Sequence, residues 1–502
     1  MKTFGKALFS ARCAWLLILA ATPLQAEPVG VPYSSFDLQG FATLGGGTTG
    51  GGVIPETDDA YRKCATPLEF ITAIRDSNKK AGAVKVIEIT ADLNLGWNEI
   101  DAASKALAST PIRCHAPPKL HPTLIASGVS MLDIAAKSGL TIFSAKGVTL
   151  KHVTLNIKKT SNIIIRNLRF DEMWEWDEAT KGDYDSNDWD FMVLSNGGAV
   201  SNVWIDHCTF TKAYDGIADM KKGTQNVTFS WCRYVGDDGA TNPRSHVRLQ
   251  IAALEADRKS HPFYNFLRTH GFTPEDIVRI IQGQDKGHLM GATKKAPGNS
   301  LLSSTFHHLW FQNVWDRCVP RLRGGQVHNY NLFVDDSTAL AARRLRDSRS
   351  DAMPPSARAT LNKTYNFNPF LNGSISTEGG AILVEKSIYQ DCLWPLRNNQ
   401  GDVNDPSLTG KIKAIDTIHI MHGPDGKATT VRGDSTDAGN PLGPFQAAVI
   451  PFSWNTPDGS RPYPAPPMDD PVELPRILAA GAGAGTLDWP KENWLKTKLY
   501  RE

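Results

Sequence analysis

The sequence has little net charge, no long apolar segment beyond its first residues, and no closely spaced cysteines. Its 54 lysines and arginines nearly balance its 52 aspartates and glutamates, giving a formal charge of +2, so composition gives no support to nucleic-acid binding. No later stretch approaches the roughly 18 apolar residues that a membrane-spanning helix needs. Without a CxxC motif or Cys/His pairs at ligand spacing, no zinc site of that kind is expected. The glycine-rich segment 45–52 lacks the Gly-Lys-Ser/Thr ending of a phosphate-binding loop.

The first residues have the pattern of a secretory signal peptide. Basic residues within the first twelve positions precede a short apolar run and a small-residue cleavage site ending at Ala26. We therefore predict a signal peptide over 1–26 and a secreted product, extracellular or periplasmic. Its removal leaves six of the seven cysteines. Six cysteines allow 15 pairings, and buried free thiols are an alternative, so the sequence does not fix a disulfide pattern.

A repeated motif is the main structural signal. Asn162–Phe170, Asn202–Phe210 and Asn226–Tyr234 each open with asparagine, alternate apolar with polar residues, and end on an aromatic residue. Weaker copies lie at 303–311 and 325–333. Short alternating strands that recur every 20-odd residues indicate a solenoid, and such a unit is too short for a βαβ crossover. The sequence therefore predicts an all-β fold, a parallel β-helix with long loops.

The rest of the chain is expected to form one domain, 27–502, with two special segments. Residues 236–283 have helical spacing, with Thr273 as an N-cap, and are predicted to form a small helical insertion. It either walls one end of a cleft or forms a lid without substrate contact. The proline-rich residues near 457 favour an extended C-terminal tail over 457–502.

Aspartates suggest a cation site on two neighbouring turns of the solenoid. Asp215 and Asp219 are four residues apart in an alternating segment, which would place both on one face of a strand. Asp188 and Asp190 share a face by the same rule. Carboxylates on turns roughly 4.8 Å apart repel unless a cation neutralises them, and such hard oxygen ligands suit calcium. The alternative is a set of solvated carboxylates on the surface.

A basic cluster follows further along the chain. Arg317, Arg321 and Arg323 lie within seven residues just before a strand-like segment, and Lys286 precedes an earlier copy of the repeat. Arginines this dense favour an anionic partner, and the guanidinium fork matches the carboxylates of a polyuronate. Salt bridges to the nearby acidic loops are the alternative.

Together these motifs resemble the pectate lyases, a family of right-handed parallel β-helix enzymes acting on polygalacturonate. The resemblance covers most of the chain after residue 36 and is most specific in five segments: Ser161–Phe170, Asp188–Asp190, Val203–His207, Asp215–Asp219 and Val227–Trp231. It implies that Asp190, Asp215 and Asp219 bind calcium and that Asp188 borders a further, substrate-dependent calcium ion. It also implies a monomer that binds polygalacturonate or pectin.

The resemblance also assigns roles to the basic residues. Lys286 and Arg323 match residues that bind substrate carboxylates, and Arg317 matches the Brønsted base. Here two residues instead of one separate Arg317 from Pro320, which a one-residue bulge would accommodate, and Arg321 is the alternative base.

The implied reaction is β-elimination that leaves 4,5-unsaturated oligogalacturonides. An arginine base, with a pKa lowered by nearby cations, implies an alkaline optimum and loss of activity with chelator. A pectin lyase acting on the methyl-esterified polymer, or a polygalacturonase using paired carboxylates, are the alternatives.

Overall fold

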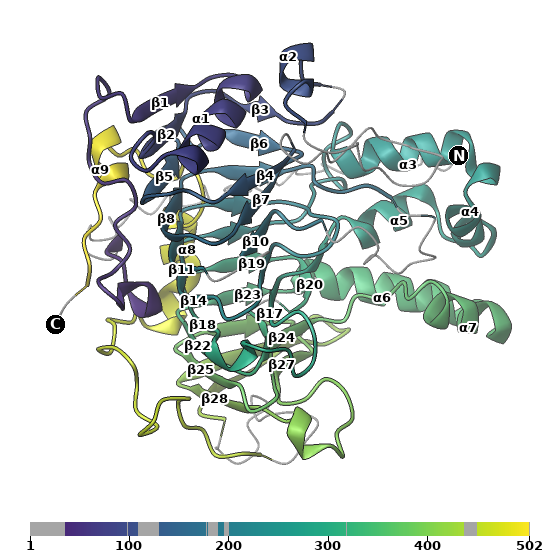
Figure 1. Ribbon diagram of the computed structural model, residues 1–502. Coiled ribbons are helices and arrows are strands. Elements are labelled where there is room, and N and C mark those ends of the chain that lie inside the picture. The colour runs from purple at the N-terminus through teal and green to yellow at the C-terminus, as the bar shows by residue number, and fades with distance from the viewer. Residues whose placement is uncertain are drawn as a thin grey trace, which may run out of the picture.

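The computed structural model shows a stack of short parallel strands that runs the length of the molecule (Figure 1). It describes residues 36–97, 99–108, 130–176, 178, 189–194, 200–317, 319–435 and 449–500. The predicted signal peptide and Asp188 lie outside these residues. Within them, the strands form three large sheets, and each turn of the chain contributes strands to successive sheets. This is the predicted parallel β-helix.

The first sheet contains the repeated motif. Val203 of one copy pairs with Ile163 of the preceding copy and Val227 of the next, so the copies lie in register. Each copy opens with an asparagine in the left-handed backbone region, with φ of 62° at Asn162 and 53° at Asn202, which asparagine tolerates better than most residues. In spatial order the strands are β1 (Tyr61–Cys64), β2 (Val86–Ile89), β5 (Leu140–Phe143), β8 (Ser161–Arg166), β11 (Ser201–Asp206), β14 (Gln225–Ser230), β18 (Ser303–His307), β22 (Gln326–Tyr330), β25 (Ala381–Glu385) and β28 (Lys411–Ile415).

The second sheet has an inner apolar face and a polar outer face. Met220, Met290 and Leu322 are in register and fully buried. The residue before each of them, Asp219, Leu289 and Arg321 respectively, points to the opposite face, as expected of strands. In spatial order the strands are β27 (Trp394–Arg397), β24 (Asn372–Thr377), β21 (Arg321–Arg323), β17 (His288–Met290), β13 (Ala218–Met220), β10 (Met192–Leu194), β7 (Thr154–Ile157) and β4 (Met131–Ile134).

The third sheet contains the aromatic residues that end the repeats. The ring centroids of Phe170 and Phe210 lie 5.2 Å apart, those of Phe210 and Tyr234 5.2 Å, and those of Tyr234 and Phe311 4.2 Å. In spatial order the strands are β3 (Leu93–Asn94), β6 (Thr149–Lys151), β9 (Arg169–Asp171), β12 (Thr209–Phe210), β15 (Arg233–Tyr234), β19 (Trp310–Gln312), β23 (Phe333–Asp335), β26 (Ile388–Gln390), β29 (Thr417–His422) and β30 (Ala428–Gly433). A small extra sheet pairs β16 (Gln284–Lys286) with β20 (Val314–Asp316).

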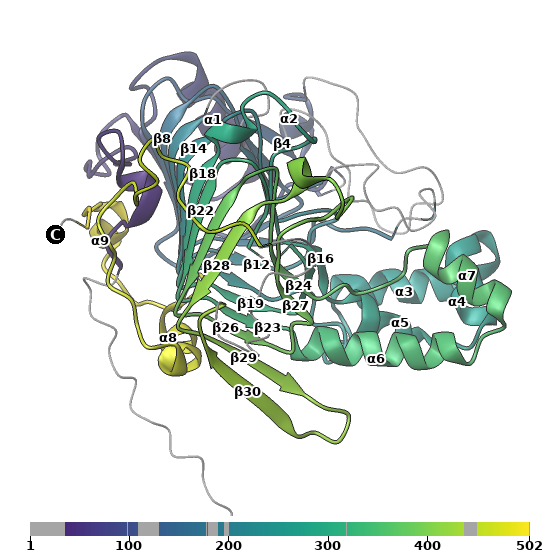
Figure 2. The same cartoon turned by 90° about the horizontal axis from the view of Figure 1, so that it is seen from below.

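Helices from two separate segments project from the same side of the β-helix (Figures 1 and 2). The first segment, predicted as helical, contains α3 (His246–Ala256), α4 (Pro262–Thr269) and α5 (Pro274–Ile281), and Thr273 caps α5. The second contains α6 (Ser337–Asp351) and α7 (Pro355–Lys363), and α5 packs against both α3 and α6. No helix was predicted there, because the buried face of α6 is mostly alanine, serine and Arg346 rather than large apolar residues.

Two further helices lie at the N-terminal end of the stack. They are α1 (Pro67–Lys79) and α2 (Ala102–Lys105), and α1 begins with a capping box formed by Thr66 and Glu69.

Among the described residues, no helix combines the length and apolar character needed to cross a membrane. The cysteines that the structure describes, Cys64, Cys208, Cys232 and Cys392, are buried free thiols.

The C-terminal segment, predicted to be extended, returns along the outside of the stack toward its start. It forms α8 (Leu474–Gly481) and α9 (Lys491–Leu495), because both helices bury apolar residues against the β-helix. Leu478 lies in a cluster with Phe333 and Ile388 of the third sheet, and Trp494 lies in a cluster with Val86 and Phe143 of the first. Near the end of the chain, the N–H of Leu38 donates to the carbonyl oxygen of Lys498 at 2.8 Å.

Candidate active site

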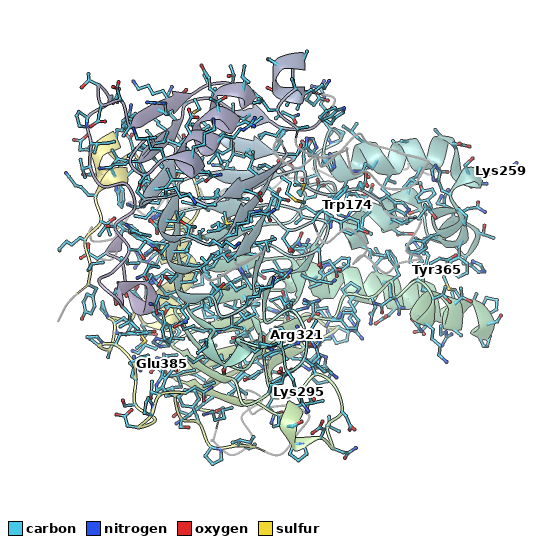
Figure 3. The ribbon with its side chains drawn as sticks, in the orientation of Figure 1. Trp174, Lys259, Lys295, Arg321, Tyr365 and Glu385 are labelled. Atoms are coloured by element: carbon cyan, nitrogen blue, oxygen red, sulfur yellow. The ribbon has the colours of Figure 1, made fainter. Side chains whose placement is uncertain are left out.

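The candidate site lies on the outer face of the second sheet. Asp219 of β13, Leu289 of β17 and Arg321 of β21 pair in register, so their side chains project on one face, opposite the buried Met220. Figure 3 labels Arg321 on this sheet. The register of the sheet therefore brings Asp219 of the predicted acidic group and Arg321 of the predicted basic group to one surface, although these residues are about a hundred residues apart in the chain.

The three predicted calcium ligands that the structure describes converge around Gly216. The N–H of Gly216 donates to Asp190 Oδ1 at 2.7 Å. A Cβ atom at this glycine would lie 2.7 Å from Asp190 Oδ1 and 3.4 Å from Asp219 Oδ1, so a side chain there would occupy space between the two carboxylates. Asp190, Asp215 and Asp219 are all at least nine-tenths buried. Their oxygens form the hard donor set that calcium prefers, so the residues present fit this ion.

Asp215 reaches the cluster by a different route from the predicted one. It lies in the bend before β13, not on the strand, so strand alternation does not explain its position. Ala213 forms an isolated bridge with Met173, and the chain bends between that bridge and β13. The N–H of Asp215 donates to the carbonyl oxygen of Trp189 at 3.2 Å, which places Asp215 beside Asp190.

Two lysines form ion pairs with the aspartates. Lys286 Nζ lies 2.7 Å from Asp215 Oδ1, and both side chains are mostly buried. Lys221 Nζ lies 3.2 Å from Asp219 Oδ2. Lys286 was expected near substrate carboxylates, whereas Lys221 was missed. Its position two residues after Asp219, directly after β13, is a signal in the sequence that could have found it.

Arg317 lies beside the acidic cluster. Its backbone has a φ of 53°, in the left-handed region, so the chain turns sharply there before β21. Burial lowers the pKa of Arg317, but the carboxylates of Asp316, Asp215 and Asp219 outweigh burial and hold that pKa above its ordinary value. The neighbouring Cys318 lies outside the described residues. Arg317 thus lies in the electrostatic field of two predicted calcium ligands.

Arg321 and Arg323 lie two residues apart on β21, two strands from Asp219. Burial, Arg323 and Arg317 lower the pKa of Arg321 to about 9. Burial and Arg317 also lower the pKa of Arg323. Arg323 donates to the carbonyl oxygens of Gly291 and, at 2.8 Å, Ala292. Two neighbouring, partly desolvated guanidinium groups give this part of the sheet the charge that an anion would need for binding.

A further polar network that the sequence did not reveal supports Arg317. Asp316 Oδ1 accepts from the N–H of Arg317 at 2.9 Å and from Asn372 Nδ2 at 2.7 Å. Arg397 in turn donates to Asn372 Oδ1 at 3.0 Å. Burial and the charge of Asp316 raise the pKa of the nearby Asp285 to about 6. These residues come from β16, β20, β24 and β27, and only the stacking of the rungs brings them together.

Comparison with known proteins identifies the family. A family model described as pectate lyase matches residues 16–241, a range that includes Asp190, Asp215 and Asp219 and ends before Lys286. Pectate lyase B of Paenibacillus amylolyticus is 44% identical over 410 residues, which cover 81% of this chain and 98% of that protein. The chain belongs to the pectate lyase family. The resemblance drawn from the sequence motifs is thereby confirmed.

Solved structures of pectate lyases agree with this assignment. A pectate lyase from Paenibacillus sp. 0602 superposes with a TM-score of 0.82 at 45% identity, covering 92% of this chain and 99% of that one. A pectate lyase from Bacillus sp. N165, solved in complex with trigalacturonate, superposes with a TM-score of 0.50 at 15% identity and shows the shared fold alone. The parallel β-helix predicted from the repeats is therefore the fold of this family.

Proposed function

We propose that the chain is a secreted, calcium-dependent pectate lyase that cleaves polygalacturonate by β-elimination and leaves 4,5-unsaturated oligogalacturonides. Its membership of the pectate lyase family supports the activity on pectate. One observation carries the calcium-dependent mechanism: the buried carboxylates of Asp190, Asp215 and Asp219 converge beside Lys286 and Arg317.

Elimination removes the proton on C5 of a uronate and expels the oxygen linked at C4. Asp190, Asp215 and Asp219 would hold a calcium ion, which when bound supplies positive charge to acidify the proton beside the uronate carboxylate. Lys286 and Arg323 would bind substrate carboxylates and add fixed positive charge where negative charge develops. For this, Lys286 exchanges its contact with Asp215 for a contact with substrate.

The base must be a neutral guanidine, and two arginines compete for the role. Arg317 has a raised pKa because it faces Asp316, Asp215 and Asp219. Neutralising Asp215 and Asp219 would remove two of the charges that raise it, so the Arg317 pKa would fall when the cluster is loaded. The pKa of Arg321 is already lowered, to about 9, but Arg321 lies beside Arg323 rather than beside the carboxylates. We favour Arg317, because the base must act next to the cation site.

The decisive experiment follows the absorbance of the unsaturated product during incubation with polygalacturonate. The expected result is an ultraviolet increase that a chelator abolishes and added calcium restores. Fully methyl-esterified pectin is the matched control substrate. A calcium-independent increase on that control would instead identify a pectin lyase, and new reducing ends without ultraviolet absorbance would identify a hydrolase.

We also propose that the chain is exported, is cleaved after Ala26, and acts as a monomeric single domain of residues 27–502. The signal-peptide pattern at the N-terminus supports export. N-terminal sequencing of protein recovered outside the producing cells tests the cleavage, and light scattering of that product tests the monomer. Recovery of the chain only inside the cells, with an intact N-terminus, contradicts this proposal.

A further inference from the structure

A second group of metal-ligand residues lies at the corner between the third and second sheets. His152 lies between β6 and β7, Glu172 directly follows β9, and His246 is the first residue of α3. One ligand atom from each residue lies within 4.8 Å of the other two. None of these residues belongs to the aspartate cluster. His152 and His246 are buried, and Glu172 is half-buried, so the group lies at the junction of the β-helix and the helical insertion.

Both imidazole rings approach the same carboxylate oxygen. His152 Nε2 lies 3.7 Å from Glu172 Oε2, and His246 Nδ1 lies 3.8 Å from it. These separations are too long for hydrogen bonds. Ligand atoms around a tetrahedral zinc ion, with bonds of about 2.0–2.1 Å, lie roughly 3.4 Å apart. The two nitrogen–oxygen separations exceed that value by only a few tenths of an ångström, and the two ring nitrogens lie within 4.8 Å of each other, so a small inward movement of the rings would suit a shared ion.

The outer nitrogen of His152 is held by an acceptor. His152 Nδ1 lies 2.8 Å from Asn94 Oδ1, and that oxygen also accepts from the N–H of Gly96 at 3.0 Å, which fixes the orientation of the amide. His152 Nδ1 therefore carries the hydrogen. In the neutral ring the lone pair is then on Nε2, the nitrogen that faces Glu172.

The outer nitrogen of His246 is held in the same way. His246 Nε2 lies 2.6 Å from the backbone carbonyl oxygen of Trp174, which can only accept, and 2.8 Å from the amide nitrogen of Gln250, which can only donate. The amide donates to the same carbonyl at 3.0 Å, and the shorter contact of the ring with that carbonyl favours the tautomer with the hydrogen on Nε2. The lone pair of neutral His246 is then on Nδ1 and also faces Glu172.

Two nitrogen lone pairs thus face one carboxylate oxygen. Metal-binding histidines commonly have this arrangement, in which the outer N–H donates to a carbonyl and fixes the ring orientation. Lys151 Nζ holds the other oxygen of Glu172 at 2.6 Å and so directs Oε2 toward the rings. A pocket of about 330 Å³, lined by Glu172, His246 and Asp237 among others, borders the group and gives a path for an ion and for a water ligand.

We propose that His152, Glu172 and His246 form a second metal site, selective for zinc or a similar borderline dication. Two neutral imidazoles and one carboxylate suit zinc, whereas calcium prefers an all-oxygen set. The site would attach α3 to two neighbouring corners of the β-helix and so fix the helical insertion. Figure 3 labels Trp174, whose carbonyl holds His246, at the base of that insertion, well apart from Arg321.

The test uses tag-free mature protein, stripped with chelator and titrated with Zn²⁺ alone by calorimetry. One equivalent should bind, and a large excess of Ca²⁺ should not displace it. Replacing Zn²⁺ by Co²⁺ should give the visible absorption of a tetrahedral site. Glu172→Gln and His246→Gln should each weaken Zn²⁺ binding by more than about 100-fold, beyond the 10- to 100-fold typical of lost outer-shell partners.

The matched control is His270→Gln. His270 also lies on the insertion, where its Nδ1 lies 2.8 Å from the carbonyl oxygen of Phe266, so its loss should leave Zn²⁺ binding unchanged.

Binding that persists in both site variants, or that is absent from the parent chain, overturns the proposal. If a site variant does not fold, the cobalt spectrum of the parent chain decides, because an octahedral or absent spectrum contradicts the assigned donors. Calcium-dependent cleavage by Glu172→Gln is a separate readout, so failure of the proposed lyase activity would not be mistaken for failure of this site.

Discussion

The two ligand clusters of this molecule differ in how the fold assembles them. Asp190, Asp215 and Asp219 come from two successive turns, close together in the sequence, and their carboxylates surround one glycine. His152, Glu172 and His246 come from two strand corners and a helix, 20 and 74 residues apart in the sequence. The first cluster has oxygen donors alone and the second has mostly nitrogen donors. Stacking of turns thus places two chemically distinct groups of candidate ligands on one scaffold, and separate substitutions can test the two proposed sites.

The largest expected effect distinguishes Arg317 from Arg321 as the catalytic base. Arg317→Ala should lower kcat on polygalacturonate by about 100- to 10,000-fold, the range for a lost general base. Arg321→Ala should lower kcat by only roughly 10-fold, because it removes one contribution to the local positive charge. A larger loss in Arg321→Ala than in Arg317→Ala would reverse the assignment.

The pH profile gives an independent measurement of the same choice. Only the neutral guanidine can accept a proton, so the rate rises about tenfold per pH unit below the pKa of the base. If Arg321 were the base, the rate would level off near pH 9, because its pKa is about 9. With Arg317, the carboxylate of Asp316, which is not a proposed calcium ligand, still raises the pKa when the cluster is loaded, so the rate should still be rising at pH 9.

Removal of one calcium ligand should have the next largest effect. Asp219→Asn should lower activity by roughly 100-fold or more at fixed calcium, because the amide carries no charge to offset a cation. Asp133→Asn is the matched control, since Asp133 lies in the same row of the second sheet, three strands away, and pairs with Lys158 at 2.5 Å. Equal losses in the two variants would mean that general surface charge, not a calcium site, is being measured. Zinc binding should be intact in both.

A milder change tests the geometry of the first cluster. Gly216→Ala places a methyl group 2.7 Å from Asp190 Oδ1, which forces the carboxylates apart. The calcium concentration for half-maximal activity should rise about 10- to 100-fold, the range for an altered ligand environment. The rate at saturating calcium should be largely restored. A calcium dependence equal to that of the parent chain would show that the space beside Gly216 is not used.

The smallest effect on catalysis is expected from the second cluster. Glu172→Gln should leave kcat within about twofold of the parent. With zinc at 100 times the parent Kd, the parent chain should gain about 2.7 kcal/mol of stability that the variant lacks. Thermal unfolding with and without zinc measures this difference. A zinc-induced rise in Tm of equal size in both proteins contradicts the proposed site.

Whether the sequence predicts the position of a residue depends on the interactions that hold that residue in place. Asn162 and Asn202 revealed the turns of the β-helix, because each repeated turn needs the same backbone conformation. Asp219 followed from strand alternation, but Asp215 did not, because its position depends on a bend and a bridge that alternation does not describe. Roles for Arg317 and Lys286 remain predictions that the proposed variants can test.

Contacts between distant segments were not predictable from the sequence. The histidine–glutamate cluster has no local spacing pattern, since His246 joins it only because α3 packs against the corner at Trp174. Helix α6 escaped prediction for a related reason, since its buried face has few large apolar residues and it is held against α5 partly by the ion pair of Arg349 with Asp276 at 2.9 Å.

The returning C-terminal segment changes how the molecule should unfold. In a simple solenoid each repeat contacts only its neighbours, so the ends can fray independently. Here Arg166 of an early turn donates to the carbonyl oxygens of Trp494 and Lys496, each at 3.1 Å, and Tyr463 contacts Thr305 of a later turn at 3.0 Å. The C-terminal segment thus links turns of the β-helix that do not contact each other directly. Such a solenoid should lose its early and late turns in a single cooperative step.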